Sequence, residues 1–188
     1  MTTTSVRIRM AEPSDAAAVL AMFDGIMHWL VAQGRTGQWG TELWSETPAL
    51  VDRVVERIER RELRVAVDPD GGEVLGVVSL SEECGTYVSP PPEPELFINL
   101  LGTSRAAKGL NVGGLLLEEA RAEARRRGLR LVRVDCYAGD DRKLNAWYVS
   151  QGFTEVGPFV VKREGRADWP GMLLAQYLWE QPATEAAH

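Results

Sequence analysis

Cysteine and histidine are both scarce in this 188-residue sequence, with two of each. Cys84 and Cys136 lie far apart and form no CxxC pair, so we expect no disulfide framework and reduced thiols of the kind found in the cytosol. His28 and His188 lie near opposite ends of the chain. With so few soft ligands we expect no metal site. A catalytic histidine would have to be His28, beside which the sequence places no nucleophile.

Long apolar runs and an excess of basic charge are also missing. No uninterrupted apolar stretch approaches the ~20 residues that cross a bilayer, and the N-terminal MTTTSVRIRM lacks the apolar core of a signal peptide. The net charge of -6 argues against nucleic acid or an anionic membrane as the main partner. We therefore expect a cytoplasmic protein that binds neither nucleic acid nor membrane.

The length and composition are those of one globular domain. With 45% hydrophobic and 26% charged residues, the chain can bury a sizeable core. No internal repeat or domain boundary is apparent. Residues 1–188 are therefore expected to form a single domain, with a disordered tail over 183–188.

The spacing of apolar residues predicts strands alternating with helices. The predicted helices cover about 13–33, a segment opening at Thr47, about 112–127, and a short stretch ending at Gln151. The predicted strands cover 6–10, 63–67, 74–80, 95–103, 131–136, 156–162 and 172–179, with a turn over 168–171 before the last. The strand–helix–strand order over 95–136 implies a parallel pair with a right-handed crossover.

The segment Thr103–Leu117, TSRAAKGLNVGGLLL, joins a predicted strand to a predicted helix. Gly109, Gly113 and Gly114 allow the backbone to approach a ligand closely. The helix directs unpaired N–H groups and its positive dipole end into this loop. The pattern predicts an anion site suited to phosphates, although a glycine loop that only turns a corner would look the same.

Three phosphate-binding patterns compete for this segment. A P-loop, GxxxxGK[ST], is excluded because Ala107 and Gly109 occupy the positions of its second glycine and its hydroxyl. A dinucleotide loop needs GxGxxG and an acid about 20 residues on. The stretch 109–114 gives GxNxxG and Asp135 is suitably placed. A nicotinamide-dependent oxidoreductase therefore stays open as an alternative.

The third pattern fits best. Lys108–Gly113, KGLNVG, resembles motif A of the GCN5-related N-acetyltransferase (GNAT) superfamily, [QR]-x-x-G-x-[GA]. Lys108 replaces Gln or Arg but keeps the positive charge, and Asn111 replaces glycine but tolerates a left-handed backbone. Tyr148–Phe153, YVSQGF, resembles the family's Y-x-x-x-G-F. The two landmarks stand in the family's order, and the predicted elements match over nearly the whole chain.

The resemblance implies an α/β (α+β) fold. Its central sheet would be mixed, mostly antiparallel and about seven strands wide, with about four flanking helices. The parallel pair, about 95–103 and 130–136, would splay apart. The implied activity is N-acyl transfer, usually from acetyl-CoA, to a primary amine of a small molecule or peptide by direct attack in a ternary complex. A catalytically inactive CoA-binding regulatory module is an alternative, and a homodimer is compatible with the family.

The resemblance also implies a donor site. The pyrophosphate would bind N–H groups of the loop that contains Lys108, Gly109, Leu110, Asn111, Val112, Gly113 and Gly114. The pantetheine would bond backbone groups at Leu101, Gly102 and Thr103 like an added strand, and an N–H near Leu101 would polarise the thioester. Tyr148 would protonate the departing thiolate, unless it is simply a core tyrosine. Asp141 would contact pantetheine or cap a helix.

The acceptor side is harder to read from the sequence. By period two, Glu95 and Asn99 share a strand face with Leu101, so Glu95 is a candidate general base acting through a water, or an exposed strand-start carboxylate. His28, Trp39, Trp44 and Asn99 are the substrate-binding candidates, together with the 82–94 loop. The two tryptophans could equally cap the edge of the core. The identity of the acceptor amine does not follow from these residues.

Overall fold

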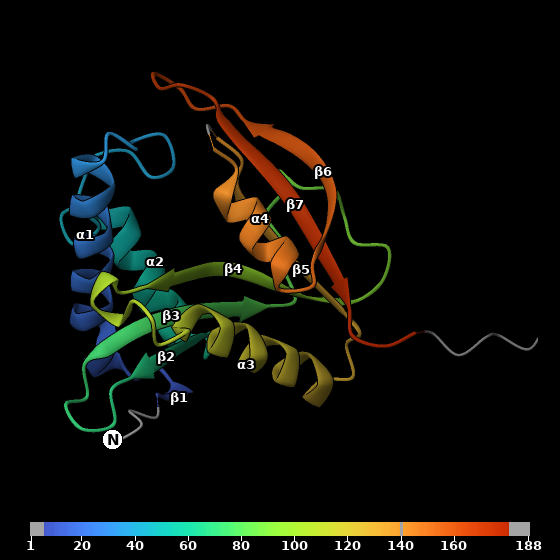
Figure 1. The fold of residues 1–188 in the computed structure, drawn as a ribbon, viewed down its shortest axis with the longest axis horizontal. Coiled ribbons are helices and arrows are strands. Elements are labelled where there is room, and N and C mark those ends of the chain that lie inside the picture. Colours follow the sequence, from blue (N-terminus) through green and yellow to red (C-terminus); the bar gives the residue numbers. More distant parts are fainter. Residues whose placement is uncertain (1–5, 140, 181–188) are drawn as a thin grey trace, which may run out of the picture.

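The fold is a twisted sheet with helices on both faces (Figure 1). The computed structural model describes residues 6–139 and 141–180, so His188 and the predicted tail lie outside the described residues. The sheet has seven strands in the order β1-β2-β3-β4-β5-β7-β6. The strands are β1 (Arg7–Met10), β2 (Leu63–Val67), β3 (Val74–Ser81), β4 (Glu95–Thr103), β5 (Leu131–Tyr137), β6 (Thr154–Val161) and β7 (Trp169–Tyr177).

The described helices confirm the predicted order of elements. They are α1 (Ala16–Ala32), α2 (Pro48–Glu59), α3 (Val112–Arg126) and α4 (Lys143–Ser150), with short 3-10 turns at Pro13–Asp15 and Arg105–Ala107. Neighbouring strands run antiparallel except β4 and β5, which are parallel. Helix α3 connects these two strands, as a crossover between parallel strands requires. The predicted mixed sheet with one parallel pair is therefore confirmed.

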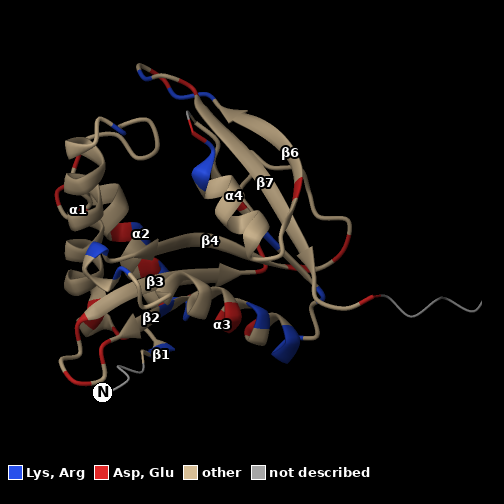
Figure 2. Ribbon diagram, in the orientation of Figure 1, with Lys and Arg blue, Asp and Glu red and all other residues tan. Residues whose placement is uncertain are grey.

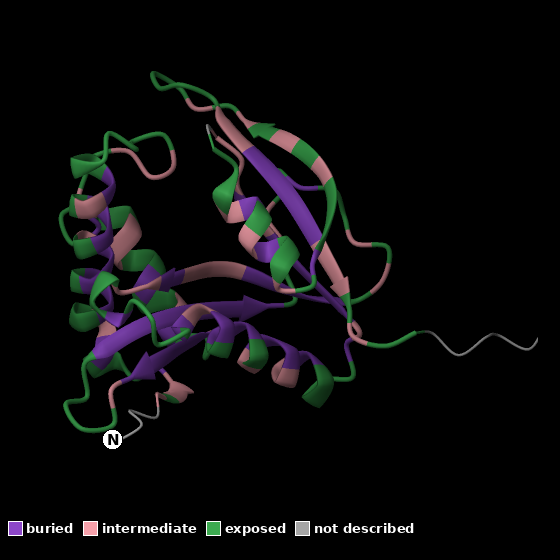
Figure 3. Ribbon diagram, in the orientation of Figure 1, coloured by how far each residue is buried: buried purple, intermediate pink, exposed green. Residues whose placement is uncertain are grey.

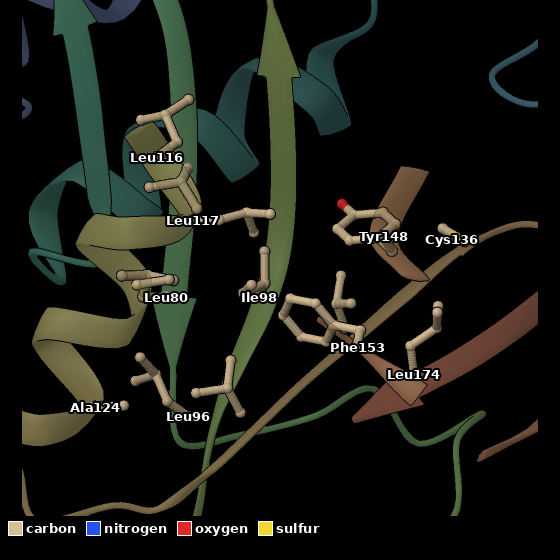
Figure 4. Close-up of a cluster of buried hydrophobic side chains, with 14 of the residues drawn as sticks. Leu80, Leu96, Ile98, Leu116, Leu117, Ala124, Cys136, Tyr148, Phe153 and Leu174 are labelled. Carbon is tan, nitrogen blue, oxygen red and sulfur yellow. The ribbon is translucent and has the colours of Figure 1, made fainter. Parts of the chain in front are cut away.

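Two hydrophobic clusters lie on opposite faces of the sheet. One packs α3 and α4 against it and includes Leu80, Ile98, Leu116 and Tyr148 (Figure 4). The other packs α1 and α2 against β2 and β3. Figure 3 shows the central strands buried and the outward sides of the helices exposed. Each helix thus buries one apolar stripe against the sheet.

Strand β4 changes register in its middle. Leu100 pairs with Ser79 and Ile98 with Leu80, which leaves Asn99 as the extra residue of a bulge. Beyond the bulge, Leu101 joins the α3 side of the sheet and Leu100 the α1 side. The period-two expectation that Glu95 and Asn99 share a face with Leu101 is therefore wrong, because an inserted residue reverses the alternation.

One further expectation needs correction. Residues 169–171 were predicted as a turn, but Trp169 begins β7 and the connection from β6 covers 162–168. By length and composition alone, Pro13–Ala32 is apolar enough to cross a membrane, with a mean hydropathy of 1.4. Most of its large apolar residues, among them Phe23 and Met27, are buried in the cluster with α2. Core helices also meet this criterion.

Candidate active site

The parallel pair opens into a cleft. Strands β4 and β5 pair from Glu95–Leu131 to Ile98–Val134, and no later pair is formed between them. A cavity of about 340 Å³ lies at the open end. It is lined by β4 at Leu101, Gly102 and Thr103, by α4 at Lys143, Leu144, Trp147 and Tyr148, by Gly113, and by Ile26, Trp29, Leu30, Arg35, Gln38, Trp39 and Arg105. Figure 2 shows basic residues at the start of α4, beside this cleft.

The predicted phosphate loop adjoins the cleft. A hollow of about 200 Å³ is lined by Thr103, Ser104, Arg105, Ala107, Lys108, Gly109, Asn111, Val112, Gly113, Gly114 and Trp147. Thr103, Arg105, Gly113 and Trp147 line both spaces, which therefore lie directly beside each other. Leu110 is exposed and is not among the lining residues.

The loop's backbone explains its residue types. Gly109 has φ +91° and Asn111 has φ 52°, both in the left-handed region, where glycine and asparagine are best tolerated. A Cβ at Gly113 would meet the Trp147 ring at 3.0 Å. The loop therefore brings its backbone close to the cleft at the N-terminus of α3, beside the cations of Lys108 and Arg105. This donor set suits the pyrophosphate of a coenzyme such as CoA.

Tyr148 lies at the inner end of the cleft. Its side chain is 4% exposed and contacts Trp147 and Phe153 edge-on, with ring centroids 4.9 and 5.7 Å away. Its hydroxyl lies on the β4 side of the ring (Figure 4). Burial raises the pKa of Tyr148, so the hydroxyl keeps its proton. Among the described residues no hydrogen bond uses this hydroxyl, which leaves a proton donor available in the cleft.

Glu95 does not have the surroundings of a general base. It is 2% exposed and forms a bidentate ion pair with Arg133, in which Oε1 lies 2.8 Å from Nη2 and Oε2 contacts Nε. Arg133 also donates to the carbonyl oxygen of Ser89, at 2.9 Å. The predicted catalytic role of Glu95 is therefore replaced by a structural one, because its lone pairs are occupied and it lies in the paired half of β4.

Asp135 and Asn99 lie at the apex of the cleft. They directly follow the last paired residues, Val134 and Ile98. The Asp135 carboxylate accepts a hydrogen bond from Tyr87, and burial raises its pKa to about 6. In the described part of the chain, Asp135 forms no ion pair. An acid at a strand end was visible in the sequence, but only the structure shows that it stands where β4 and β5 separate, although it is not among the residues lining the cavity.

The other predicted site residues divide into two groups. Trp39 lines the cleft, and Asn99 lies at its apex. Trp44 is 5% exposed and stacks on Phe23 at 4.0 Å between ring centroids; it belongs to the core, which corrects its predicted substrate role. His28 is exposed on α1 and is not among the residues lining the cleft.

Asp141 lies outside the cleft lining. Its Oδ1 accepts a hydrogen bond from the Lys143 backbone N–H at 3.1 Å. Its Oδ2 lies 3.1 Å from Nη2 of Arg35 in an exposed ion pair. These contacts support the helix-start interpretation of Asp141 rather than the predicted contact with pantetheine. Asp140 lies outside the described residues.

The sequence model of the Acetyltransferase (GNAT) family matches residues 24–153. This match includes both sequence landmarks and covers more than half of the chain. The chain belongs to the GNAT acetyltransferase family. The family assignment is incompatible with the dinucleotide-oxidoreductase alternative, since the same loop is now explained by motif A.

Solved structures agree with the fold of this acetyltransferase. YncA, a putative acetyltransferase from Salmonella typhimurium with its cofactor acetyl-CoA, has 19% identity and a TM-score of 0.67, covering 97% of this chain and 99% of that one. A putative phosphinothricin N-acetyltransferase has 25% identity and a TM-score of 0.68, covering 94% and 100%. A ribosomal-protein-alanine N-acetyltransferase from Brucella melitensis has 23% identity and a TM-score of 0.64, covering 92% and 99%. No curated protein matches this chain significantly in sequence.

Proposed function

We propose that this acetyltransferase transfers the acetyl group of acetyl-CoA to a primary amine of a small molecule or peptide by direct attack. The observation that carries the proposal is the pair of adjoining spaces that extend from the phosphate loop past Thr103 to Tyr148. It combines an anion-binding backbone, an unpaired strand edge and a buried proton donor. The free thiols of Cys84 and Cys136 are consistent with a cytosolic location, which we propose on that basis.

The donor would bind along the loop and the strand edge. N–H groups from Lys108 to Gly114 would hold the pyrophosphate at the N-terminus of α3. Beyond Ile98, the β4 edge facing β5 has no strand partner, so backbone groups of residues 101–103 are available to the pantetheine amides. An N–H near Leu101 would stabilise the negative charge that develops on the thioester oxygen.

Two side chains at the apex would move the protons. The acceptor ammonium would lose its proton to the Asp135 carboxylate, and the free amine would attack the thioester carbonyl carbon. When the tetrahedral intermediate collapses, its C–S bond breaks and the CoA sulfur accepts the Tyr148 proton. The amide nitrogen releases its second proton to solvent. An acid with a raised pKa and a base with a pKa near 6 suit these two roles at neutral pH.

The first experiment is a thermal-shift comparison of acetyl-CoA, free CoA, NADH and ATP. A ligand at 100 times its Kd adds about 2.7 kcal/mol of apparent stability, so a shift is expected with the two CoA compounds only. An amine panel then measures release of the CoA thiol. Tyr148→Phe should lower kcat by about tenfold or more, whereas Tyr177→Phe, on an exposed strand end, should not. Unchanged turnover in Tyr148→Phe would remove the acid role; CoA binding without turnover would favour a regulatory module.

A further inference from the structure

A second hollow lies on the α2 side of β4. It measures about 270 Å³. Its lining comes from α2 and the residues just after it, up to Glu62, from Ser81 and 83–85, and from Asn99 of β4. Three arginines line it: Arg53 and Arg57 of α2, and Arg60 directly after the helix. The phosphate loop does not line this space, since the two hollows share no lining residue.

The three arginines differ in what they contact. Arg60 is exposed and holds Glu56 at 2.6 Å. Arg57 is more enclosed: its Nη1 lies 3.2 Å from Glu62 and donates to Ser79 Oγ at 2.8 Å, but its buried Nε has no hydrogen-bond partner. Arg53 is exposed and forms no ion pair within the described residues. Arg53 therefore retains its donors for an anion, and so does Arg57 through Nη2, for which no hydrogen bond is found within the described residues.

The hollow reaches the apex of the cleft. Asn99 lines it, and the Nδ2 of Asn99 donates to Ser81 Oγ at 2.7 Å. Tyr87 connects the two regions, because it hydrogen-bonds Asp135 and lies within the electrostatic influence of both Arg53 and Arg57. The hollow therefore borders, through Asn99, the point where β4 and β5 separate, next to the carboxylate proposed to take the amine's proton.

We propose that this hollow is the anion subsite of the acceptor, and that the acceptor is a primary amine that also carries a carboxylate. The inference rests on the proposed function for the position of the amine. The carboxylate would accept hydrogen bonds from Arg53 and Arg57, in the charge-assisted geometry that guanidinium favours. The ammonium group would face Asp135. Of the acids in the hollow, Glu56 and Glu62 are paired with arginines, and Glu83 lies exposed at its rim. The arginines would thus bind the negative end of a zwitterion, and Asp135 would face its positive end.

Matched acceptor pairs test the proposal. Each pair consists of an amino acid and the amine in which hydrogen replaces its α-carboxylate: L-phenylalanine with 2-phenylethylamine, L-methionine with 3-(methylthio)propylamine, and glycine with methylamine. Thiol release with acetyl-CoA gives kcat/KM for both members. In at least one pair the amino acid should be preferred by about tenfold or more, the scale of a hydrogen bond to a charged group.

Two variants locate the preference. Arg53→Gln removes an exposed, unpaired charge and should lower the amino-acid-to-amine ratio about tenfold. Arg57→Lys keeps the charge but loses the planar guanidinium donors and should also lower the ratio. Arg125→Gln, an exposed change near the end of α3, is the matched control and should leave the ratio within about twofold, as expected for a distant screened charge. An unchanged ratio in Arg53→Gln and Arg57→Lys would overturn the anion subsite.

A binding experiment distinguishes failure of this inference from failure of the proposed function. The protein is titrated with N-acetyl-L-phenylalanine and with N-acetyl-2-phenylethylamine, with and without CoA, and the melting temperature is followed. Stabilisation by the carboxylate compound alone, lost in Arg53→Gln, supports the subsite even if no amine is acetylated. Equal effects of the two compounds, together with equal kcat/KM within every pair, would overturn it. Absence of both a CoA shift and thiol release would instead contradict the proposed function.

Discussion

Each half of the β4–β5 pair contains one acidic side chain, but within the described part of the chain only the acid in the paired half forms an ion pair. In the paired half, from Glu95–Leu131 to Ile98–Val134, the buried carboxylate of Glu95 is neutralised by Arg133. In the splayed half, Asp135 has a pKa of about 6 and only a tyrosine as partner. Two acids on neighbouring strands thus have different roles, because hydrogen-bonded strands hold ion partners in register and separated strands leave room for a ligand.

Whether an acid of β4 or β5 has an ion-pair partner therefore depends on whether the two strands are paired at that point. A neutralised pair within the sheet stabilises its register, while an unpaired acid at the apex costs stability and remains free to exchange protons. The following changes test this difference, beginning with the largest expected effect.

Removing one member of the buried pair should be the most destabilising change. Glu95→Leu leaves Arg133 as an uncompensated buried charge and should lower the free energy of unfolding by about 3–5 kcal/mol, measured by urea denaturation. The double variant Glu95→Leu/Arg133→Met removes both charges and should recover most of the loss. CoA affinity of the folded protein should not change. A Glu95→Leu protein as stable as wild type but without turnover would restore a catalytic role for Glu95.

The matching change in the splayed half should affect activity. Asp135→Asn removes the proposed base and should lower kcat/KM by about 100-fold, with CoA affinity unchanged. Asp70→Asn, in the exposed turn between β2 and β3, is the control and should retain wild-type activity. A fully active Asp135→Asn enzyme would show that the amine arrives deprotonated or loses its proton elsewhere.

The raised pKa of Asp135 predicts how activity depends on pH. The carboxylate must be ionised to act as a base, so kcat/KM should rise with pH through about 6. This rise in the pH profile should be absent in Asp135→Asn. The pH profile is measured at saturating acetyl-CoA, so that any pH dependence of donor binding does not contribute to it. If kcat/KM of Asp135→Asn still rose with pH through the same range, the titration would belong to another group.

The same pKa has the opposite consequence for stability. Since the folded-state pKa lies above the unfolded value of about 3.9, the contribution of Asp135 is fully present below that value and is lost as pH rises through about 6. Asp135→Asn should therefore raise Tm at pH 7.5 and leave it unchanged at pH 4. Equal shifts at the two pH values would contradict the burial of this charge.

The smallest effect is expected outside the cleft. Asp141 pairs with Arg35 on the surface, and neighbouring contacts from the Lys143 backbone lower its pKa. Asp141→Ala should leave Tm nearly unchanged, and CoA affinity should stay within about twofold, as is usual for exposed pairs. Isothermal titration with CoA measures this. A tenfold loss of affinity would return Asp141 to the pantetheine site.

The donor side was more readable from the sequence than the acceptor side. Gly109, Asn111 and Gly113 act through the backbone of one continuous segment, so their spacing could be recognised directly, and Tyr148 was found through a second local pattern. Glu95 was misjudged because strand alternation was carried through a bulge at Asn99. Trp44 was misjudged because composition does not show that a loop tryptophan stacks on Phe23 in the core.

The sequence by itself determined the order of helices and strands, the parallel pair and the glycine loop before α3, since hydrophobic period, glycine placement and helix-end chemistry are local properties. The tertiary structure alone decided which carboxylate is neutralised and which is free, and that α2 brings Arg53 and Arg57 toward Asn99. These depend on strand register and on side chains far apart in the chain, whose contacts form only when the sheet and helices pack together.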